Sequence, residues 1–212
     1  PSGMARITEG KILPIEDEQV RGKGVFSVAI DSYQRIWGCM DTGECLVIED
    51  GTLKEIIPSD RIFENSGIYC IASDAQGNIL MGTSGNEVAV IGFPTKSLQK
   101  EDLTVEIHTT GDISFHNMIE SIGGYLMISG NNGLAIVEPD GMIKTFGEEK
   151  KAVSINAAII DYEQNVWMAS SNYGVIKYSK GCFEPLNEKT ALDGVAINAI
   201  TKVNKLWYIA HD

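Results

Sequence analysis

The sequence predicts an all-β fold, a β-propeller of four-stranded antiparallel blades, with about five blades in the 212 residues. One observation is a phrase that recurs along the chain: an apolar strand, an acidic turn and a strand centred on Trp. Its marker position falls at Trp37, Leu80, Leu126, Trp167 and Trp207, 40 to 46 residues apart. The other is that each unit consists of several short strands. A period of this length built from short strands is typical of β-propellers.

The unit that begins at Ile155 shows how one blade is predicted. Residues 155–160 form a nearly all-apolar first strand, as expected for a strand packed on both faces. An acidic turn at 161–165 precedes a second strand at 166–170, and a third strand follows at 175–178. The short outer strand 182–185 contains Pro185, which an outer edge tolerates because it needs fewer ladder hydrogen bonds.

The other units follow the same order. Third strands are expected at 43–48 and 132–137, and outer strands at 52–57 and 142–146. The longest departure lies at 92–102, where we expect a surface excursion, because insertions in repeat arrays map to loops.

The repeat favours a single β-propeller domain over residues 1–212, since each unit must pack on the next. Its units span approximately 1–24 (outer strands), 25–67, 68–114, 115–154, 155–196 and 197–212 (inner strands). Outer strands at one end and inner strands at the other would together make one complete sheet, which predicts a closed five-bladed ring. A fragment of a larger propeller would show the same phase, so both alternatives remain open.

Composition excludes several classes of partner. The 29 acidic residues outnumber the 17 basic ones, and the net charge of -12 repels phosphate backbones and anionic lipid headgroups. We therefore expect no nucleic-acid partner. The sequence holds no run of about 18 apolar residues and no signal-peptide pattern at its start, so we expect no direct membrane insertion in this segment.

The four cysteines are Cys39, Cys45, Cys70 and Cys182, and none forms a C-x-x-C pair. Small buried thiols are the favoured interpretation. Cys39 and Cys45 could face each other across a hairpin, so a disulfide there and two free thiols both stay open.

The recurring Trp is interpreted as a packing residue. A wide flat side chain fills the wedge between two splayed sheets while its N–H finds a partner at the edge. Small residues just beyond it allow the sheets to approach closely: Cys39, Gly82, Thr83, Ser129, Ala169, Ser170 and Ala210.

Candidate ligand-binding residues come from two sets. The second position of the first strands gives a column of two aromatic rings, one imidazole and two carboxamides: Phe26, Tyr69, His116, Asn156 and Asn198. This set suits hydrogen bonding and stacking on a sugar-like ligand better than it suits a divalent ion. Alternatively, Asn156 and Asn198 satisfy backbone groups where the strand begins.

The second set lies in the loops between second and third strands, which share a face with the starts of the first strands in propellers. We expect these residues to line one mouth with the column, although turn chemistry explains the Asn residues equally well. The set is Asp41, Asn86, Asn131, Asn132, Asn172 and Tyr173.

Catalytic motifs do not stand out, so the sequence predicts a protein that is not an enzyme and that needs no metal or cofactor. It contains no nucleophile elbow, phosphate loop, H-E-x-x-H or dinucleotide fingerprint, and its histidines are His108, His116 and His211. Two alternatives remain: a metal-dependent propeller lactonase or lyase, whose site needs converging carboxylates, Asn and His, and a scaffold for protein interactions.

The repeat resembles the bacterial two-component regulator propeller repeat. The pattern of that family is Asp-x-x-Gly-x-φ-Trp, a small-residue step with Gly-Thr, and Gly-Leu at the third strand. Asp74-Ala-Gln-Gly-Asn-Ile-Leu-Met-Gly-Thr83 matches it apart from Leu80, whereas 31–37 and 161–167 lack the turn Gly. Gly133-Leu134 and Gly174-Val175 match the third-strand opening, and the unit at 115 departs most. The resemblance covers nearly the whole chain.

That resemblance implies a sensor domain outside the cytoplasm, in the periplasm or at the cell surface, that precedes a membrane helix and a histidine kinase or another output domain. It also implies a small-molecule or oligosaccharide ligand and neighbouring signalling domains as partners. Signalling is thus an expectation from the resemblance alone.

Overall fold

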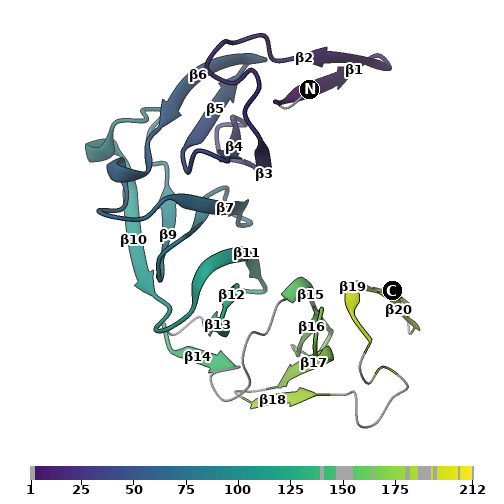
Figure 1. The fold of residues 1–212 in the computed structure, drawn as a ribbon. Helices are drawn as coiled ribbons and strands as arrows, with labels where there is room; N and C mark the ends of the chain where they lie inside the picture. Colours follow the sequence, from purple (N-terminus) through teal and green to yellow (C-terminus); the bar gives the residue numbers. More distant parts are fainter. Residues whose placement is uncertain are drawn as a thin grey trace. The chain divides into compact units, whose positions relative to one another are not determined.

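The structure is a computed structural model that describes residues 3–138, 141–146, 155–163, 165–179, 182–185, 192, 195–204 and 206–211. Apart from two short 3-10 helices, η1 (Ser59–Arg61) and η2 (Lys100–Asp102), the regular structure of these residues is all β (Figure 1). The chain packs as two compact units, residues 1–120 and 121–212.

Unit 1 (residues 1–120) opens with a two-stranded sheet and continues with two four-stranded meanders. β1 (Ala5–Thr8) pairs with β2 (Lys11–Pro14). The next sheet has the order β3 (Val25–Ile30), β4 (Ile36–Met40), β5 (Cys45–Glu49) and β6 (Thr52–Ile57). The following one has β7 (Ile68–Ser73), β8 (Ile79–Thr83), β9 (Glu87–Gly92) and β10 (Thr104–Thr109).

The third four-stranded sheet has the order β11 (Ser114–Ile122), β12 (Tyr125–Asn131), β13 (Gly133–Val137) and β14 (Ile143–Phe146). Unit 2 (residues 121–212) then holds β15 (Ile155–Ile160), β16 (Val166–Ser170), β17 (Gly174–Ser179) and β18 (Cys182–Pro185). It also holds the pair β19 (Ile197–Val203) and β20 (Leu206–His211). The prediction of antiparallel four-stranded blades is confirmed, and the closed five-bladed ring and the fragment of a larger propeller remain alternative predictions.

Hydrogen bonds explain why Asp and Trp recur six residues apart. Asp31 Oδ1 accepts hydrogen bonds from the backbone N–H groups of Tyr33 at 2.9 Å and Arg35 at 3.0 Å, which closes the turn. Asp31 Oδ2 accepts from Nε1 of Trp37 at 2.8 Å and from Nε of Arg35 at 2.6 Å. One buried carboxylate therefore shapes the turn and satisfies the indole N–H, as buried polar groups require.

The same arrangement returns in the unit that starts at β15, where Asp161 Oδ2 accepts from Nε1 of Trp167 at 2.7 Å. The unit that starts at β7 has Leu80 at the Trp position. There the side-chain amide of Asn78 donates to Asp74 Oδ2 at 2.7 Å, as the amide of Asn165 at the same position donates to Asp161 Oδ2 at 3.0 Å beside the indole. In all three repeats Oδ1 of the Asp accepts a backbone N–H of the turn, whereas the side chains that donate to Oδ2 differ from one repeat to the next.

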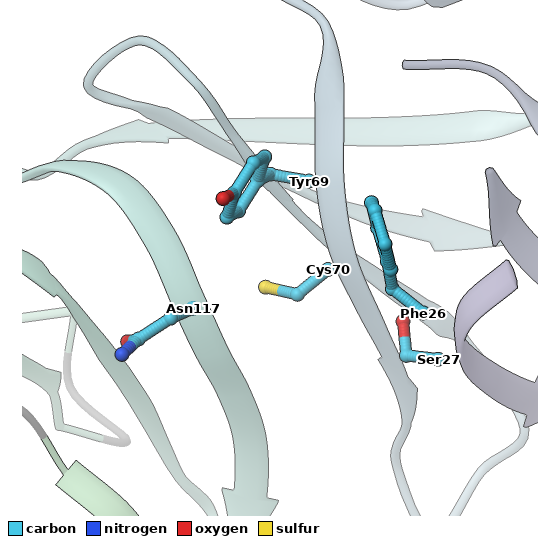
Figure 2. A pocket seen from close by; sticks show the side chains of 5 residues that line it. All are labelled: Phe26, Ser27, Tyr69, Cys70 and Asn117. Atoms are coloured by element: carbon cyan, nitrogen blue, oxygen red, sulfur yellow. The ribbon is translucent and has the colours of Figure 1, made fainter. Parts of the chain in front are cut away.

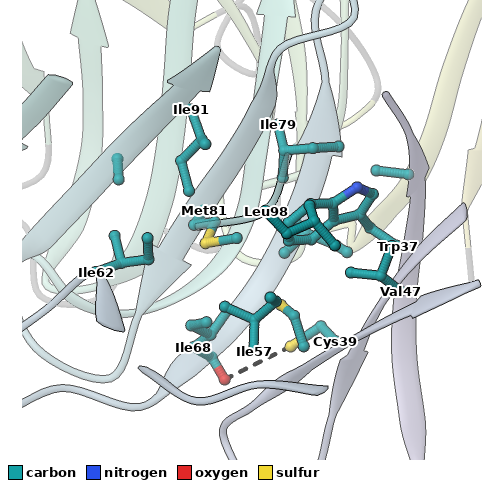
Figure 3. Close-up of a cluster of buried hydrophobic side chains, with 14 of the residues drawn as sticks. Trp37, Cys39, Val47, Ile57, Ile62, Ile68, Ile79, Met81, Ile91 and Leu98 are labelled. Atoms are coloured by element: carbon teal, nitrogen blue, oxygen red, sulfur yellow. Dashed lines mark hydrogen bonds between the residues drawn. The ribbon is translucent and has the colours of Figure 1, made fainter. Parts of the chain in front are cut away.

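The main core of unit 1 lies between the sheet β3–β6 and the sheet β7–β10. Trp37 is fully buried there, and its ring centroid lies 5.5 Å from that of Phe93. Figure 3 shows it beside Val47 and Leu98, with Ile79 and Met81 of the next sheet nearby. The burial of Trp37 between the two sheets agrees with the packing role predicted for the recurring Trp.

The insertion at 92–102 packs inward as well as lengthening a loop. Phe93 and Leu98 are buried in the main core of unit 1, and Nη1 of Arg35 donates to the carbonyl of Lys96 at 2.7 Å. The predicted surface excursion is therefore wrong for Phe93 and Leu98, because this segment folds back onto the preceding sheet.

None of the helices in the described residues is long and apolar enough to cross a membrane.

Candidate functional site

The predicted column coincides with a recurring backbone irregularity. The ladder register shifts at the second residue of β3, β7, β15 and β19, which is Phe26, Tyr69, Asn156 and Asn198. A β-bulge leaves one residue outside the pairing and re-aims its side chain. Four of the five column residues thus occupy bulges. Asn198 is exposed, and the side chain of Asn156 lies outside the described part of the chain.

Within unit 1 the bulges at Phe26 and Tyr69, together with Phe115 at the second position of β11, present a row of three aromatic rings, which we call the aromatic row. These side chains are 63%, 44% and 49% exposed. The ring centroid of Tyr69 lies 6.4 Å from that of Phe26 and 6.2 Å from that of Phe115. Large rings held in water side by side are unusual on a monomeric surface and mark a site of interaction.

A pocket of about 170 Å³ opens beside this row. Figure 2 shows the side chains of Tyr69, Cys70, Phe26, Ser27 and Asn117 around it. Its volume is below the roughly 300–1,000 Å³ typical of pockets for drug-sized ligands, so it accommodates a single small ring or one edge of a longer ligand.

His116 departs from the predicted column, because its neighbour Phe115 provides the ring that contacts Tyr69. The His116 side chain is fully buried. The backbone N–H of Thr83 donates to Nδ1 at 3.0 Å, so the ring proton lies on Nε2, 2.9 Å from Oγ1 of Thr110. His116 thus links β8 to β11. A direct contact with a ligand, as predicted, would need exposed surface, which the His116 side chain lacks in this structure.

Burial lowers the pKa of His116 to about 4, from its usual value near 6.5. Between these two values the unfolded chain binds one more proton than the folded chain, so folding stability must fall as the pH falls from 6.5 towards 4. We expect this group to cost the protein about 2–3 kcal/mol over that window. Urea unfolding at pH 7 and pH 4.5 measures the loss.

The His116→Gln variant separates this effect from the titration of carboxylates. Its unfolding free energy should change less between the two pH values than that of the unmodified protein. Equal pH dependence in the two proteins would rule out His116 as the source.

The two predicted loop residues of unit 1 take structural hydrogen bonds. Asp41 Oδ2 accepts from the backbone N–H of Gly24 at 2.8 Å, which ties the β4–β5 loop to the start of β3. The side-chain amide of Asn86 donates to the carbonyl of Gly111 at 3.0 Å. Both residues are exposed, yet their polar atoms already hold neighbouring segments together.

In unit 2 the predicted loop residues lie at two turns. Asn131 and Asn132 are exposed where β12 meets β13, and Asn132 has a positive φ of 71°. Asn172 Oδ1 accepts from the hydroxyl of Ser170 at 3.0 Å, and the backbone N–H of Tyr173 donates to the same hydroxyl at 3.2 Å. Turn chemistry accounts for these contacts, and a ligand role for these residues stays a prediction.

Sequence reasoning missed Phe115, Asn117, Ser27 and Cys70. An aromatic residue at both Phe26 and Tyr69 was a signal that could have shifted the alignment of this unit by one residue, from His116 to Phe115. The other three line the pocket because adjacent strands pack together, which a single strand does not reveal.

The pocket is suited to non-covalent binding. The rings offer stacking faces, and the Tyr69 hydroxyl offers a hydrogen-bond group. Burial raises the pKa of the Cys70 thiol to about 12, so that it stays protonated at neutral pH and is a poor nucleophile. Among the described residues, no three His, Cys, Asp or Glu side chains converge as a metal site would require.

No family model and no curated protein sequence matches the chain. Solved structures do. The extracellular domain of a hybrid two-component system from B. thetaiotaomicron aligns with a TM-score of 0.55 and 15% identity over 88% of this chain. The chain spans about a quarter (25%) of the length of that structure.

Two further structures are similar in fold. YCF48 from Cyanidioschyzon merolae aligns with a TM-score of 0.63 and 15% identity, over 99% of this chain and 71% of that one. Virginiamycin B lyase from Staphylococcus aureus aligns with a TM-score of 0.61 and 16% identity, over 85% of this chain and 61% of that one. At such identities the likeness shows the fold, a β-propeller. It is consistent with the resemblance to the two-component regulator propeller repeat.

Proposed function

We propose that this chain is a non-catalytic ligand-binding domain, the extracytoplasmic input domain of a bacterial signal-transduction receptor. Its ligand is a small molecule with a stackable ring, such as one unit of a saccharide, bound on the aromatic row. Neighbouring signalling domains are its proposed partners, and the periplasm or the cell surface its proposed location. The similarity to extracellular domains of two-component systems supports the class of protein.

The aromatic row carries the proposal for the ligand. Each pyranose ring has a face of C–H groups, which stacks on aromatic rings, and an edge of hydroxyls, which needs hydrogen bonds. Tyr69 and Phe26 supply the stacking surface, with their ring centroids 6.4 Å apart, and the Tyr69 hydroxyl supplies a polar group beside it. Burying the exposed rings against such a ligand would remove apolar surface from water.

Calorimetric titration of the protein with a panel of mono- and oligosaccharides tests this. For a sugar that binds, Tyr69→Ala should raise Kd about tenfold, because a stacked ring contributes on the order of 1 kcal/mol beyond the area it buries. The matched control is Tyr162→Ala, which removes a Tyr that is 82% exposed and lies on a turn of unit 2. An equal effect of the two variants would refute the aromatic row as the site.

Asn198→Ala and Tyr173→Ala test whether the predicted residues of unit 2 take part in the same binding. A protein that binds no sugar in the panel would contradict the saccharide ligand and favour a scaffold for protein interactions.

A lyase or lactonase is the second candidate, because the fold is shared with virginiamycin B lyase. Propeller enzymes of that kind use a divalent cation held by converging carboxylates and histidines. The pocket beside the aromatic row is lined by rings, a hydroxyl, a thiol and an amide. Metal analysis of the purified protein after addition of Mg²⁺ and Ca²⁺ separates the two functions: stoichiometric metal would favour the enzyme.

A further inference from the structure

The β4–β5 hairpin places two cysteines directly opposite each other. Cys39 and Cys45 are ladder partners, and both are free thiols that are fully buried. In the folded protein the Cys39 thiol donates to the carbonyl of Ile68, with its sulfur 3.5 Å from that oxygen.

The turn of the hairpin determines the geometry of this pair. The backbone N–H of Met40 donates to the carbonyl of Glu44 at 2.9 Å. Hydrogen-bonded and non-hydrogen-bonded pairs alternate in an antiparallel ladder, so the next pair, Cys39 with Cys45, is of the non-hydrogen-bonded type. The Cα atoms of such pairs lie about 4.5 Å apart. That separation falls within the roughly 4.4–6.8 Å found across disulfides.

The repeat offers an internal comparison for this pair. The equivalent partners are Gly82 with Val88 in the sheet β7–β10, and Ala169 with Val175 in the sheet β15–β18. Each joins a small residue to a bulkier aliphatic one. A need for a small side chain explains Cys39, but not Cys45, whose counterparts are both Val. Packing alone therefore does not account for two cysteines in this one pair.

We propose that Cys39 and Cys45 are a modification site, which a disulfide-containing oxidant converts into a cross-strand disulfide while the hairpin forms. One cysteine thiolate attacks the S–S bond of the oxidant, giving a mixed disulfide and one released thiol. The second cysteine then attacks the protein sulfur of that mixed disulfide and releases the second thiol. The pair loses two electrons and two protons, and the oxidant takes up both as it becomes two thiols.

Burial fixes the order of events. Both thiols have no exposed surface in the folded protein, so the oxidant must react before the sheets β3–β6 and β7–β10 pack. Once formed, the bond is sealed in the core and resists reduction. It lies just below the β4–β5 loop, where the carbonyl of Gly43 accepts a hydrogen bond from the N–H of Ile68 at 2.9 Å. The disulfide would thus stiffen the hairpin that supports the start of β7.

Cys70 is the competing thiol. It belongs to β7 and lines the pocket beside the aromatic row. It is buried in the folded protein as well, so a disulfide to it must likewise form before the sheets pack. A disulfide to Cys70 would also have to cross between two sheets rather than between paired strands.

The test is to refold the 212-residue protein, carrying Cys182→Ser, with oxidised glutathione and then to alkylate the remaining thiols in denaturant. We expect the mass of one intramolecular disulfide, one thiol left for alkylation, and a linked peptide pair containing Cys39 and Cys45. The oxidised protein should unfold roughly 5 °C above the reduced protein, because the bond restricts the unfolded chain.

Cys70→Ser should leave the disulfide in place, whereas Cys39→Ser and Cys45→Ser should each abolish it. The proposal is overturned if all three thiols stay free after oxidation, or if the linked peptides contain Cys70 instead of Cys45. Because peptide mapping reads the bond in the protein with Cys182→Ser as its only change, the result does not depend on whether the single-cysteine variants fold.

Discussion

Trp37→Ala should destabilise the protein by about 3–5 kcal/mol, the usual cost of removing a large buried aromatic side chain. Trp37 is fully buried between two sheets and contacts the ring of Phe93. The substitution leaves a cavity in the main core of unit 1, and it removes the indole N–H that donates to Asp31. Urea unfolding followed by circular dichroism measures the loss.

Trp37→Phe is the control, because it keeps an aromatic ring and removes only the N–H and part of the volume. Asp31 keeps its bond to Arg35 in this variant, so we expect a loss of about 1–2 kcal/mol. If Trp37→Ala cost less than about 1 kcal/mol, the wedge between the two sheets would not be the main source of stability in unit 1.

Gly77→Ala should cost about 2–4 kcal/mol, because two penalties combine at this turn. Gly77 has a φ of +78°, a backbone angle that residues with a Cβ rarely adopt. A Cβ there would lie 2.6 Å from the backbone nitrogen of Ser32 and 2.7 Å from its Cα. Backbone atoms cannot rotate away, and the N–H of Ser32 donates to the carbonyl of Gly77 at 2.9 Å. The acidic turns of the repeats that begin at β3 and β7, both in unit 1, would have to separate.

Gly111→Ala measures the cost of the positive φ alone, without a steric clash. Gly111 also has a positive φ, +64°, but nothing lies within 4 Å of its Cβ position. We expect it to cost only about 1 kcal/mol. Thermal unfolding of the two variants side by side gives the comparison, and similar losses would mean that the contact between turns contributes nothing.

The sequence predicted the strands well because their signals are local. Four strands have the predicted bounds, because apolar runs and turn residues mark their ends: 52–57, 155–160, 166–170 and 182–185. The burial of Phe93 and Leu98 could not be predicted in the same way. It depends on a contact between an inserted segment and the preceding sheet, and no period in the chain encodes that contact.

The site was predictable only as far as the repeat reaches. Phe26 and Tyr69 were found because each follows the first residue of a well-marked strand, where the bulge recurs. The unit that contains His116 lacks the acidic turn and departs most from the pattern, so its alignment was displaced by one residue from Phe115. Asn117 lines the pocket only because β11 lies beside β7, and the sequence of a single strand does not reveal such a neighbour.

The bulges at the second residue of β3, β7, β15 and β19 have a consequence for how such a protein can diversify. A residue outside the ladder takes no part in holding its sheet, so its side chain can be exchanged at little cost in stability. Each of these four repeats therefore has one position whose side chain can vary while the other residues keep the scaffold. In the proposed ligand-binding role, duplication of the repeat would add further positions of this kind without altering the ladder of any sheet.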